Sequence, residues 1–196
     1  MATQTKTEAD KLQELQRQIQ FNEKVKYVAN SIHAANNITE ILIKLSDNIL
    51  SLFDAERITI YLTDTSKKEL VSKYLIGSGI KEIRVPISPT SLAGYTAHSG
   101  KMINIADVYN DAELAKIDPQ LNFNKSWDEK SGFRTKQVLA GPIPFENKLL
   151  GVIQLINKKS SAAFTKLDEK VIIEIARVLG IAFRNQFKMI HTTRFD

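Results

Sequence analysis

The 196-residue sequence contains no cysteine, which excludes disulfides, thiolate metal ligands and thiol-based catalysis. It has only three histidines, and none of them has the i, i+4 or Glu-x-x-His spacing of a zinc site. A nucleophile, a base and an orienting group in a recognisable order are also missing. The sequence therefore predicts no metal site and no catalytic residues, and we expect a domain that is not itself an enzyme.

Long apolar runs are also missing. The longest, such as Val171-Ile172-Ile173 and Ile181-Ala182-Phe183, are interrupted by charge within a few residues, far short of the ~20 residues of a membrane span. The polar N-terminal segment has none of the features of a signal peptide. Together with the lack of cysteine, this predicts a cytoplasmic protein with no membrane span.

Charge of one sign is not concentrated anywhere. Lysine and arginine outnumber the acids by 27 to 22, a formal charge of +5, but the basic residues are scattered. Nucleic-acid binding needs a localised basic footprint, so we expect no nucleic-acid partner. With 43% hydrophobic and 25% charged residues, the composition is that of an ordinary globular domain, and the length suits one domain of about 150 residues with an added helix.

The N-terminal region predicts a long helix with two stripes. From Glu8 to about Asn36 there is no proline or glycine, and the apolar pattern changes phase near Phe21. The first stripe consists of Leu12, Leu15 and Ile19, and the second of Phe21, Val25, Val28, Ile32 and Ala35. We expect the second stripe to pack on its own domain and the first to join a partner helix, giving a homodimer through the terminal helices.

The remaining pattern predicts an α/β (α+β) domain. We expect helices at Ile38 to Phe53, Ser91 to His98 and Thr165 to His191, with a helical fragment at Asp111 to Lys116. Alternation predicts strands at Arg57 to Thr63, Glu69 to Leu75, Lys81 to Ile87, Met102 to Ile105, Lys136 to Pro144 and Lys148 to Asn157. The predicted boundaries are an N-terminal helix at 1–36, a domain at 37–190, and at 191–196 the start of a linker to a further domain.

Two segments predict a ligand cradle. The start of the Ser91 helix offers unpaired backbone amides beside small residues, a generic anion site. The long polar connection from Asp107 to about Thr135 is of a length that is usually functional. At its end, the hydroxyls of Ser131 and Thr135 suit either hydrogen bonds to a ligand or capping of a helix end. Asp128-Glu129 and Asp168-Glu169 are sequence neighbours, so neither pair forms an acid/base dyad.

Near the C-terminal end, Asn157-Lys158 closes a strand pattern, and Phe164 and then Asp168-Glu169 open the last helix. On chemistry alone this is a helix start with acidic first-turn residues and a surface ion pair worth roughly 0–1 kcal/mol. In this order, however, these residues resemble the signature of GAF domains. So do Ser91-Leu92-Ala93-Gly94, Asn104-Ile105-Ala106-Asp107 with Tyr109, Ser131-Gly132-Phe133-Arg134-Thr135 and Gly151 to Lys158.

The resemblance is to GAF domains of cyclic-nucleotide phosphodiesterases and bacterial adenylyl cyclases, and it covers roughly Ile38 to Arg184. It implies a PAS-related fold with a central antiparallel sheet, dimer-forming helices on one face and a small-molecule pocket on the other. It also implies a regulatory sensor in signal transduction, not a catalyst. By position, the ligand contacts would be Thr59, Leu75, Ile76, Ser91, Leu92, Ala93, Asp107, Tyr109, Ser131, Thr135 and Gln154. The set Asn157, Lys158, Phe164, Asp168 and Glu169 would support the pocket, with Lys158 paired to Asp168.

The sequence departs from guanine-binding relatives at two positions. Those relatives place an aromatic residue and an aspartate where this chain has Leu75 and Ile76. The change removes a stacking ring and a hydrogen-bond acceptor for the base. We therefore expect a non-covalently bound cyclic nucleotide, with cyclic AMP favoured over cyclic GMP. The alternative is a dimerisation and relay module whose pocket is degenerate or plugged by Trp127 and Phe123.

Overall fold

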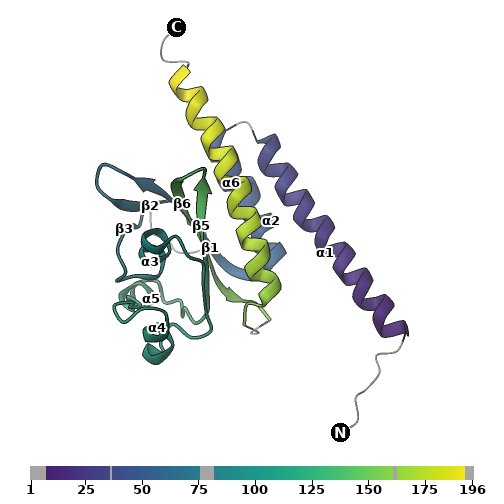
Figure 1. The fold of residues 1–196 in the computed structure, drawn as a ribbon. Coiled ribbons are helices and arrows are strands. Elements are labelled where there is room, and N and C mark those ends of the chain that lie inside the picture. Colours follow the sequence, from purple (N-terminus) through teal and green to yellow (C-terminus); the bar gives the residue numbers. More distant parts are fainter. Residues whose placement is uncertain (1–7, 36, 76–81, 161–162, 193–196) are drawn as a thin grey trace.

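A six-stranded antiparallel sheet lies at the centre of the protein (Figure 1). The structure is a computed structural model that describes residues 8–35, 37–75, 82–160 and 163–192. The strand order is β3-β2-β1-β6-β5-β4. The strands are β1 (Ala55–Asp64), β2 (Glu69–Leu75), β3 (Arg84–Pro86), β4 (Ile103–Ile105), β5 (Val138–Phe145) and β6 (Lys148–Lys158). The predicted α/β (α+β) class with a central antiparallel sheet is confirmed.

Helices cover the two faces of the sheet differently (Figure 1). The long helices α1 (Glu8–Ala34), α2 (Ile38–Phe53) and α6 (Lys166–Thr192) lie on one face. The short helices α3 (Leu92–Ser99), α4 (Asp111–Ile117) and α5 (Ser126–Ser131) lie on the other. The long helices therefore lie on one face of the sheet, as expected, and the face expected to bind a ligand carries the short helices.

Period-two alternation along the central strands creates two separate cores. On β1, Ile58 and Ile60 belong to the core beneath the long helices, whereas Tyr61 belongs to the core beneath the short helices. On β6, Ile153 packs toward the long helices and Val152 toward the short ones. Successive side chains of a strand point to opposite faces, so strands buried on both sides carry apolar residues at nearly every position.

The helices of the first face begin where the sequence predicts. Asn37 caps α2, because its side-chain oxygen accepts a hydrogen bond from the Glu40 amide at 2.8 Å. Thr165 precedes α6 and exchanges hydrogen bonds with Asp168, the arrangement of a capping box. Val171, Ile175, Leu179 and Phe183 of α6 are buried against the sheet. Gly180 lets α6 approach the sheet closely, since a Cβ atom there would lie 1.9 Å from the Pro144 carbonyl oxygen.

The two stripes of α1 differ in burial. Val28 and Ile32 are buried, and Phe21 and Val25 pack against the same core. In contrast, Leu12, Leu15 and Ile19 are 58, 53 and 50% exposed. The prediction that the later stripe packs on its own domain is therefore confirmed, and the earlier stripe extends past the sheet into solvent.

Two details differ from the sequence-based expectation. The third strand is three residues long instead of seven; its predicted first residue, Lys81, lies outside the described residues. The Asp107–Thr135 connection contains α5, which was not predicted, because only six residues form it and its first turn has no side-chain cap. Among the described helices, none combines the length and apolarity needed to cross a membrane.

Candidate ligand-binding site

A cavity of about 130 Å³ lies on the side of the sheet that carries the short helices. Its floor is formed by β1 and β6, one side by β3 and the start of α3, and the opposite side by the segment 122–135. Most of the lining is apolar or aromatic, with a few polar groups, the usual composition of a small-molecule pocket. The volume is below the ~300–1,000 Å³ typical of such pockets.

The floor carries a polar pair between two apolar strands. Thr59 on β1 is paired with Gln154 on β6, and both line the cavity. Thr59 is only 4% exposed, and Tyr61, two residues along β1, is buried beside it. Burial raises the pKa of Tyr61, so its phenol stays protonated. The floor therefore offers neutral hydrogen-bonding groups from a rigid strand pair.

The wall above the floor is the N-terminus of α3. Ser91 caps this helix by accepting a hydrogen bond from the Gly94 amide at 3.2 Å, and Ser91, Leu92 and Ala93 all line the cavity. Gly94 brings the helix close to its preceding segment, because a Cβ atom there would lie 2.5 Å from the Pro86 carbonyl oxygen. The helix thus directs its positive N-terminal end toward the cavity.

Asp128 organises the opposite wall. This carboxylate is 8% exposed and accepts hydrogen bonds from the Thr135 amide at 2.7 Å, the Thr135 hydroxyl at 2.7 Å and the Tyr109 hydroxyl at 3.0 Å. Burial and the hydrogen bond to Asp128 raise the pKa of Tyr109, so its hydroxyl stays a donor. One buried carboxylate therefore ties α5 to the end of the connection.

Cationic side chains stack on the aromatic residues of this wall. The guanidinium carbon of Arg57 lies 3.4 Å from the centre of the Phe133 ring, and that of Arg134 lies 3.3 Å from the centre of the Tyr109 ring. Burial lowers the pKa of Arg57, and the carboxylates of Asp128 and Glu56 oppose this shift. Arg57 therefore contributes a positive charge to the cavity lining, partly balanced by Asp128.

Asn157, outside the cavity, fastens the end of the connection to the sheet. It has a left-handed backbone conformation, with φ of 49°. Its side-chain oxygen accepts hydrogen bonds from the Lys136 and Gln137 amides at 2.8 and 3.0 Å, and its side-chain amide donates to the Arg134 carbonyl oxygen at 2.9 Å. Asparagine tolerates this conformation better than most residues, so one residue supplies both the turn and the fastening.

The remaining signature residues join this region to α6. The Lys158 ammonium lies 3.1 Å from Asp168 Oδ2, and both side chains are largely buried. The same Asp168 oxygen accepts hydrogen bonds from the amide and hydroxyl of Thr165. The Lys158–Asp168 pair expected from the resemblance is therefore present, and it links the end of β6 to the first turn of α6.

Glu169 fastens β4 to the same helix start. Its carboxylate accepts a hydrogen bond from the Asn104 side-chain amide at 2.8 Å, and the same amide donates to the Phe164 carbonyl oxygen at 3.0 Å. Burial tends to raise the pKa of Glu169, but the contacts with Asn104 and Lys166 outweigh it, so that the pKa is lowered. None of the five signature residues lines the cavity.

The structure brings together most of the expected contact residues. Those lining the cavity are Thr59, Ser91, Leu92, Ala93, Ser131, Thr135 and Gln154. Asp107 and Tyr109 do not line it: Asp107 accepts a hydrogen bond from the Tyr109 amide, and Tyr109 supports Asp128. The backbone of Leu75 pairs with Thr59, but its side chain is not described, and Ile76 lies outside the described residues.

Other lining residues were not predicted. These are Arg57, Tyr61, Ile83, Val85, Asn122, Asn124, Asp128, Phe133 and Ile156. A period-two rule would have found several, because Arg57 and Tyr61 flank Thr59, and Ile156 follows Gln154, at alternate positions of strands. No local pattern marks Asp128, since its partners lie seven and 19 residues away. Trp127 and Phe123, considered as lining or plugging residues, both line the cavity.

Metal chemistry finds no support here. Within the described ranges, no group of three or more histidine, cysteine, aspartate or glutamate residues is arranged to hold a metal ion. The polar groups of the cavity are instead hydroxyls, amides, one arginine and one carboxylate that is already hydrogen-bonded. Such a set is suited to binding an organic ligand through hydrogen bonds and stacking.

Comparison with known proteins identifies relatives of the chain. It is 30% identical over 171 residues to the probable 3',5'-cyclic phosphodiesterase pde-5 of Caenorhabditis elegans, covering 81% of this chain and 22% of that protein. It is 32% identical over 180 residues to the dual 3',5'-cyclic-AMP and -GMP phosphodiesterase 11A of Takifugu rubripes, covering 84% of this chain and 18% of that protein. The chain thus spans about a fifth of the length of these relatives.

A solved structure confirms the fold independently. The GAF domain from a phosphoenolpyruvate-protein phosphotransferase of Coxiella burnetii superposes with a TM-score of 0.71 at 17% identity, covering 86% of this chain and 95% of the other. The family model for the GAF domain matches residues 37–183, from the cap of α2 to the last buried turn of α6. With this match over most of its length, the chain belongs to the GAF domain family.

Proposed function

We propose that this domain is a non-catalytic regulatory sensor that binds a cyclic nucleotide and relays the signal through α1 and α6 to an output domain. The observation that carries the proposal is the cavity itself. It combines the positive end of α3 with a polar floor of Thr59 and Gln154, in a domain whose curated relatives are named as cyclic-nucleotide phosphodiesterases. A helix N-terminus favours a phosphate, and the floor suits the polar edges of a base or ribose.

The contacts proposed for the ligand follow from this geometry. The cyclic phosphate would lie at Ser91, Leu92 and Ala93, and the remainder of the nucleotide against Thr59 and Gln154. Further contacts are proposed for Leu75, Ile76, Ser131 and Thr135. Asp107 and Tyr109 would act indirectly, since Tyr109 holds Asp128. Leu75 and Ile76, which supply neither a stacking ring nor a carboxylate, favour cyclic AMP over cyclic GMP.

Ligand binding would require the wall formed by residues 122–135 to move. The cavity of about 130 Å³ is smaller than a typical ligand pocket, and Trp127, Phe123 and Phe133 occupy its edge. Near the end of this wall the Arg134 carbonyl oxygen accepts a hydrogen bond from Asn157, and the next residue, Lys158, forms an ion pair with Asp168 at the start of α6. A ligand that favours one position of the wall would thereby bias α6, to the extent of its differential affinity for the two states.

Thermal unfolding with and without cyclic AMP, cyclic GMP and their linear monophosphates tests this proposal. A ligand present at 100 times its dissociation constant adds about 2.7 kcal/mol to the free energy of unfolding. We expect a higher unfolding temperature with cyclic AMP and a smaller rise with cyclic GMP. The linear monophosphates are the control, and equal unfolding temperatures in all samples would contradict nucleotide binding.

A second candidate function is a dimerisation and relay module whose pocket stays closed. The specific observation in its favour is the aromatic edge of the cavity, where Trp127 and Phe133 reduce the space for a ligand. Under either function we propose a cytoplasmic homodimer formed through the terminal helices, with any catalysis in the output domain. The exposed stripe of α1 supports the dimer.

A further inference from the structure

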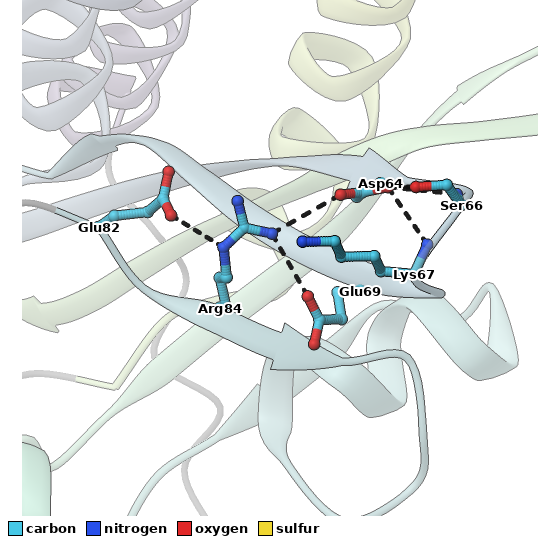
Figure 2. A network of polar contacts seen from close by, with 6 residues as sticks. All are labelled: Asp64, Ser66, Lys67, Glu69, Glu82 and Arg84. Atoms are coloured by element: carbon cyan, nitrogen blue, oxygen red, sulfur yellow. Dashed lines mark hydrogen bonds and ion pairs between the residues drawn. The ribbon is translucent and has the colours of Figure 1, made fainter.

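Arg84, the first residue of β3, is surrounded by three carboxylates (Figure 2). Its Nε lies 2.9 Å from Glu82 Oε1, and its Nη1 lies 3.4 Å from Glu69 Oε2 and 3.6 Å from Asp64 Oδ2. Glu69 begins β2 and Asp64 ends β1, so the arginine joins the edge strand to both sides of the β1–β2 turn. We call Arg84, Asp64, Glu69 and Glu82 the arginine clamp.

The anchor at Asp64 is itself held in place. Its Oδ1 accepts hydrogen bonds from the Ser66 hydroxyl at 2.6 Å, the Ser66 amide at 3.2 Å and the Lys67 amide at 3.3 Å (Figure 2). The hydrogen bond from Ser66 lowers the pKa of Asp64, so this carboxylate stays charged at neutral pH. The turn therefore presents a fixed negative group to the guanidinium.

The residues on either side of Arg84 form part of the cavity wall. Ile83 and Val85 line the cavity, whereas Arg84 is exposed. In an extended strand, neighbouring side chains point to opposite sides, so the clamp holds the outer side of the same segment whose inner side faces the cavity. Any movement of β3 away from β2 would therefore displace this wall.

β3 is short and pairs with β2 at three positions, Glu69–Pro86, Leu70–Val85 and Val71–Arg84. It has three residues, lies at the edge of the sheet and includes Pro86, which has no amide hydrogen to donate. The flanking bonds are those of the Ile83 amide to the Ser72 hydroxyl at 2.7 Å, the Ser72 amide to the Ile83 carbonyl oxygen at 2.9 Å, and the Ile87 amide to the Lys68 carbonyl oxygen at 3.0 Å. Besides this pairing and the packing of Ile83, Val85 and Ile87 against the core, the ion pairs of Arg84 join β3 to the β1–β2 turn.

We propose that Arg84 is a positioning residue of the ligand pocket: through the arginine clamp it keeps β3 docked, so that Ile83 and Val85 stay in place in the cavity wall and the bound ligand dissociates more slowly. This inference rests on the proposed ligand-binding role of the cavity. Arg84 lies on the side of β3 that faces away from the cavity, and it does not line the cavity. Because the clamp is partly exposed, its strength falls as salt rises.

The experiment compares wild type with Arg84→Gln and Arg84→Lys, and uses Arg177→Gln, an exposed site on α6, as the matched control. The first measurement is amide hydrogen exchange. We expect the Ile83 and Ile87 amides to exchange about fivefold faster in Arg84→Gln, with no change in β6. Arg84→Lys should restore part of the protection, and about 1 M salt should bring wild type close to Arg84→Gln.

The second measurement is the dissociation rate of whichever of cyclic AMP or cyclic GMP binds wild type. We expect dissociation about fivefold faster in Arg84→Gln and unchanged in Arg177→Gln. Unchanged exchange at Ile83 and Ile87, or faster exchange that extends equally to β6, would overturn the clamp. Faster local exchange with an unchanged dissociation rate would overturn its control of the ligand. If neither nucleotide binds wild type, the proposed function fails, and the exchange data still decide whether Arg84 holds the wall.

Discussion

Asp128 connects three parts of the cavity wall through its buried carboxylate: α5, Tyr109 and Thr135. Its two oxygens accept three hydrogen bonds, from Tyr109 and from the amide and hydroxyl of Thr135. Thr135, which the sequence marks as a ligand contact, therefore already gives its only hydroxyl proton to Asp128. Toward a ligand, this hydroxyl can offer only its lone pairs, so it suits a donor group such as an amine or a ribose hydroxyl.

Two substitutions separate the shape of Asp128 from its charge. Asp128→Ala leaves buried donors without partners, and we expect it to lower the free energy of unfolding by about 1–3 kcal/mol. Asp128→Asn should cost less than half as much, because its oxygen still accepts from Tyr109 and the Thr135 amide while its amide donates to the Thr135 hydroxyl. Equilibrium urea unfolding measures both. Equal losses for the two variants would show that the charge, through Arg57, and not the hydrogen-bond geometry, is what stabilises this wall.

At the scale of helices and strands, the sequence predicted elements whose signals are local. The caps Asn37 and Ser91 and the αL residue Gly100 mark helix ends within three or four residues of their partners, and these boundaries are close to the observed ones. The signals failed where an element depends on distant contacts. The N-cap residue of α5, Lys125, makes no side-chain bond to the helix, and Asp128 within α5 bonds to Thr135. The ion pairs of Arg84 join β3 to residues 15 and 20 positions earlier.

The difference between local signals and distant contacts also applies to the candidate site. Floor residues such as Thr59 could be predicted because strand alternation and the family resemblance both point to them. Ser131 and Thr135 of the opposite wall were expected from the resemblance as well, but Phe133 was not, because it stacks with Arg57, which lies 76 positions earlier in the chain. A contact between such distant positions is invisible to any pattern read along a single sequence.

The packing of α6 against the sheet leads to a prediction for Gly180→Ala. Two effects of this substitution change the free energy of unfolding in opposite directions. By helix propensity alone, Gly180→Ala would stabilise α6 by about 1 kcal/mol. The new Cβ atom, however, would lie 1.9 Å from the Pro144 carbonyl oxygen, so the helix must move away from β5. Overpacking of this kind costs about 1–3 kcal/mol, and since the clash is with backbone we expect net destabilisation. Urea unfolding measures the change in the free energy of unfolding, and Arg177→Ala, on the exposed side of α6, is the control. A Gly180→Ala variant that is more stable than wild type would contradict the packing argument.

For the whole molecule, the uneven burial of α1 predicts how two chains associate. Leu12, Leu15 and Ile19 recur at spacings of three and four and are at least half exposed, whereas the next apolar residues pack on their own domain. Three large apolar side chains along one exposed stripe match the a and d positions of a coiled coil. The family match begins at residue 37, so this stripe belongs to a segment outside the conserved domain and is available for association.

Substitutions in this stripe test the proposed homodimer directly. We expect the wild-type chain of 22.1 kDa to have the mass of a dimer in sedimentation equilibrium, and the double variant Leu15→Glu/Ile19→Glu to have that of a monomer, because charges at these positions repel across the seam. Gln13→Glu is the matched control: it adds a negative charge at an exposed position of α1 outside the stripe and should leave the dimer intact. The circular dichroism of all variants should keep its helical signal, since neither side chain lies in the core. A wild-type chain that stays monomeric at high concentration, or a double variant that still dimerises, would show that any partner of α1 is not a second copy held by this stripe.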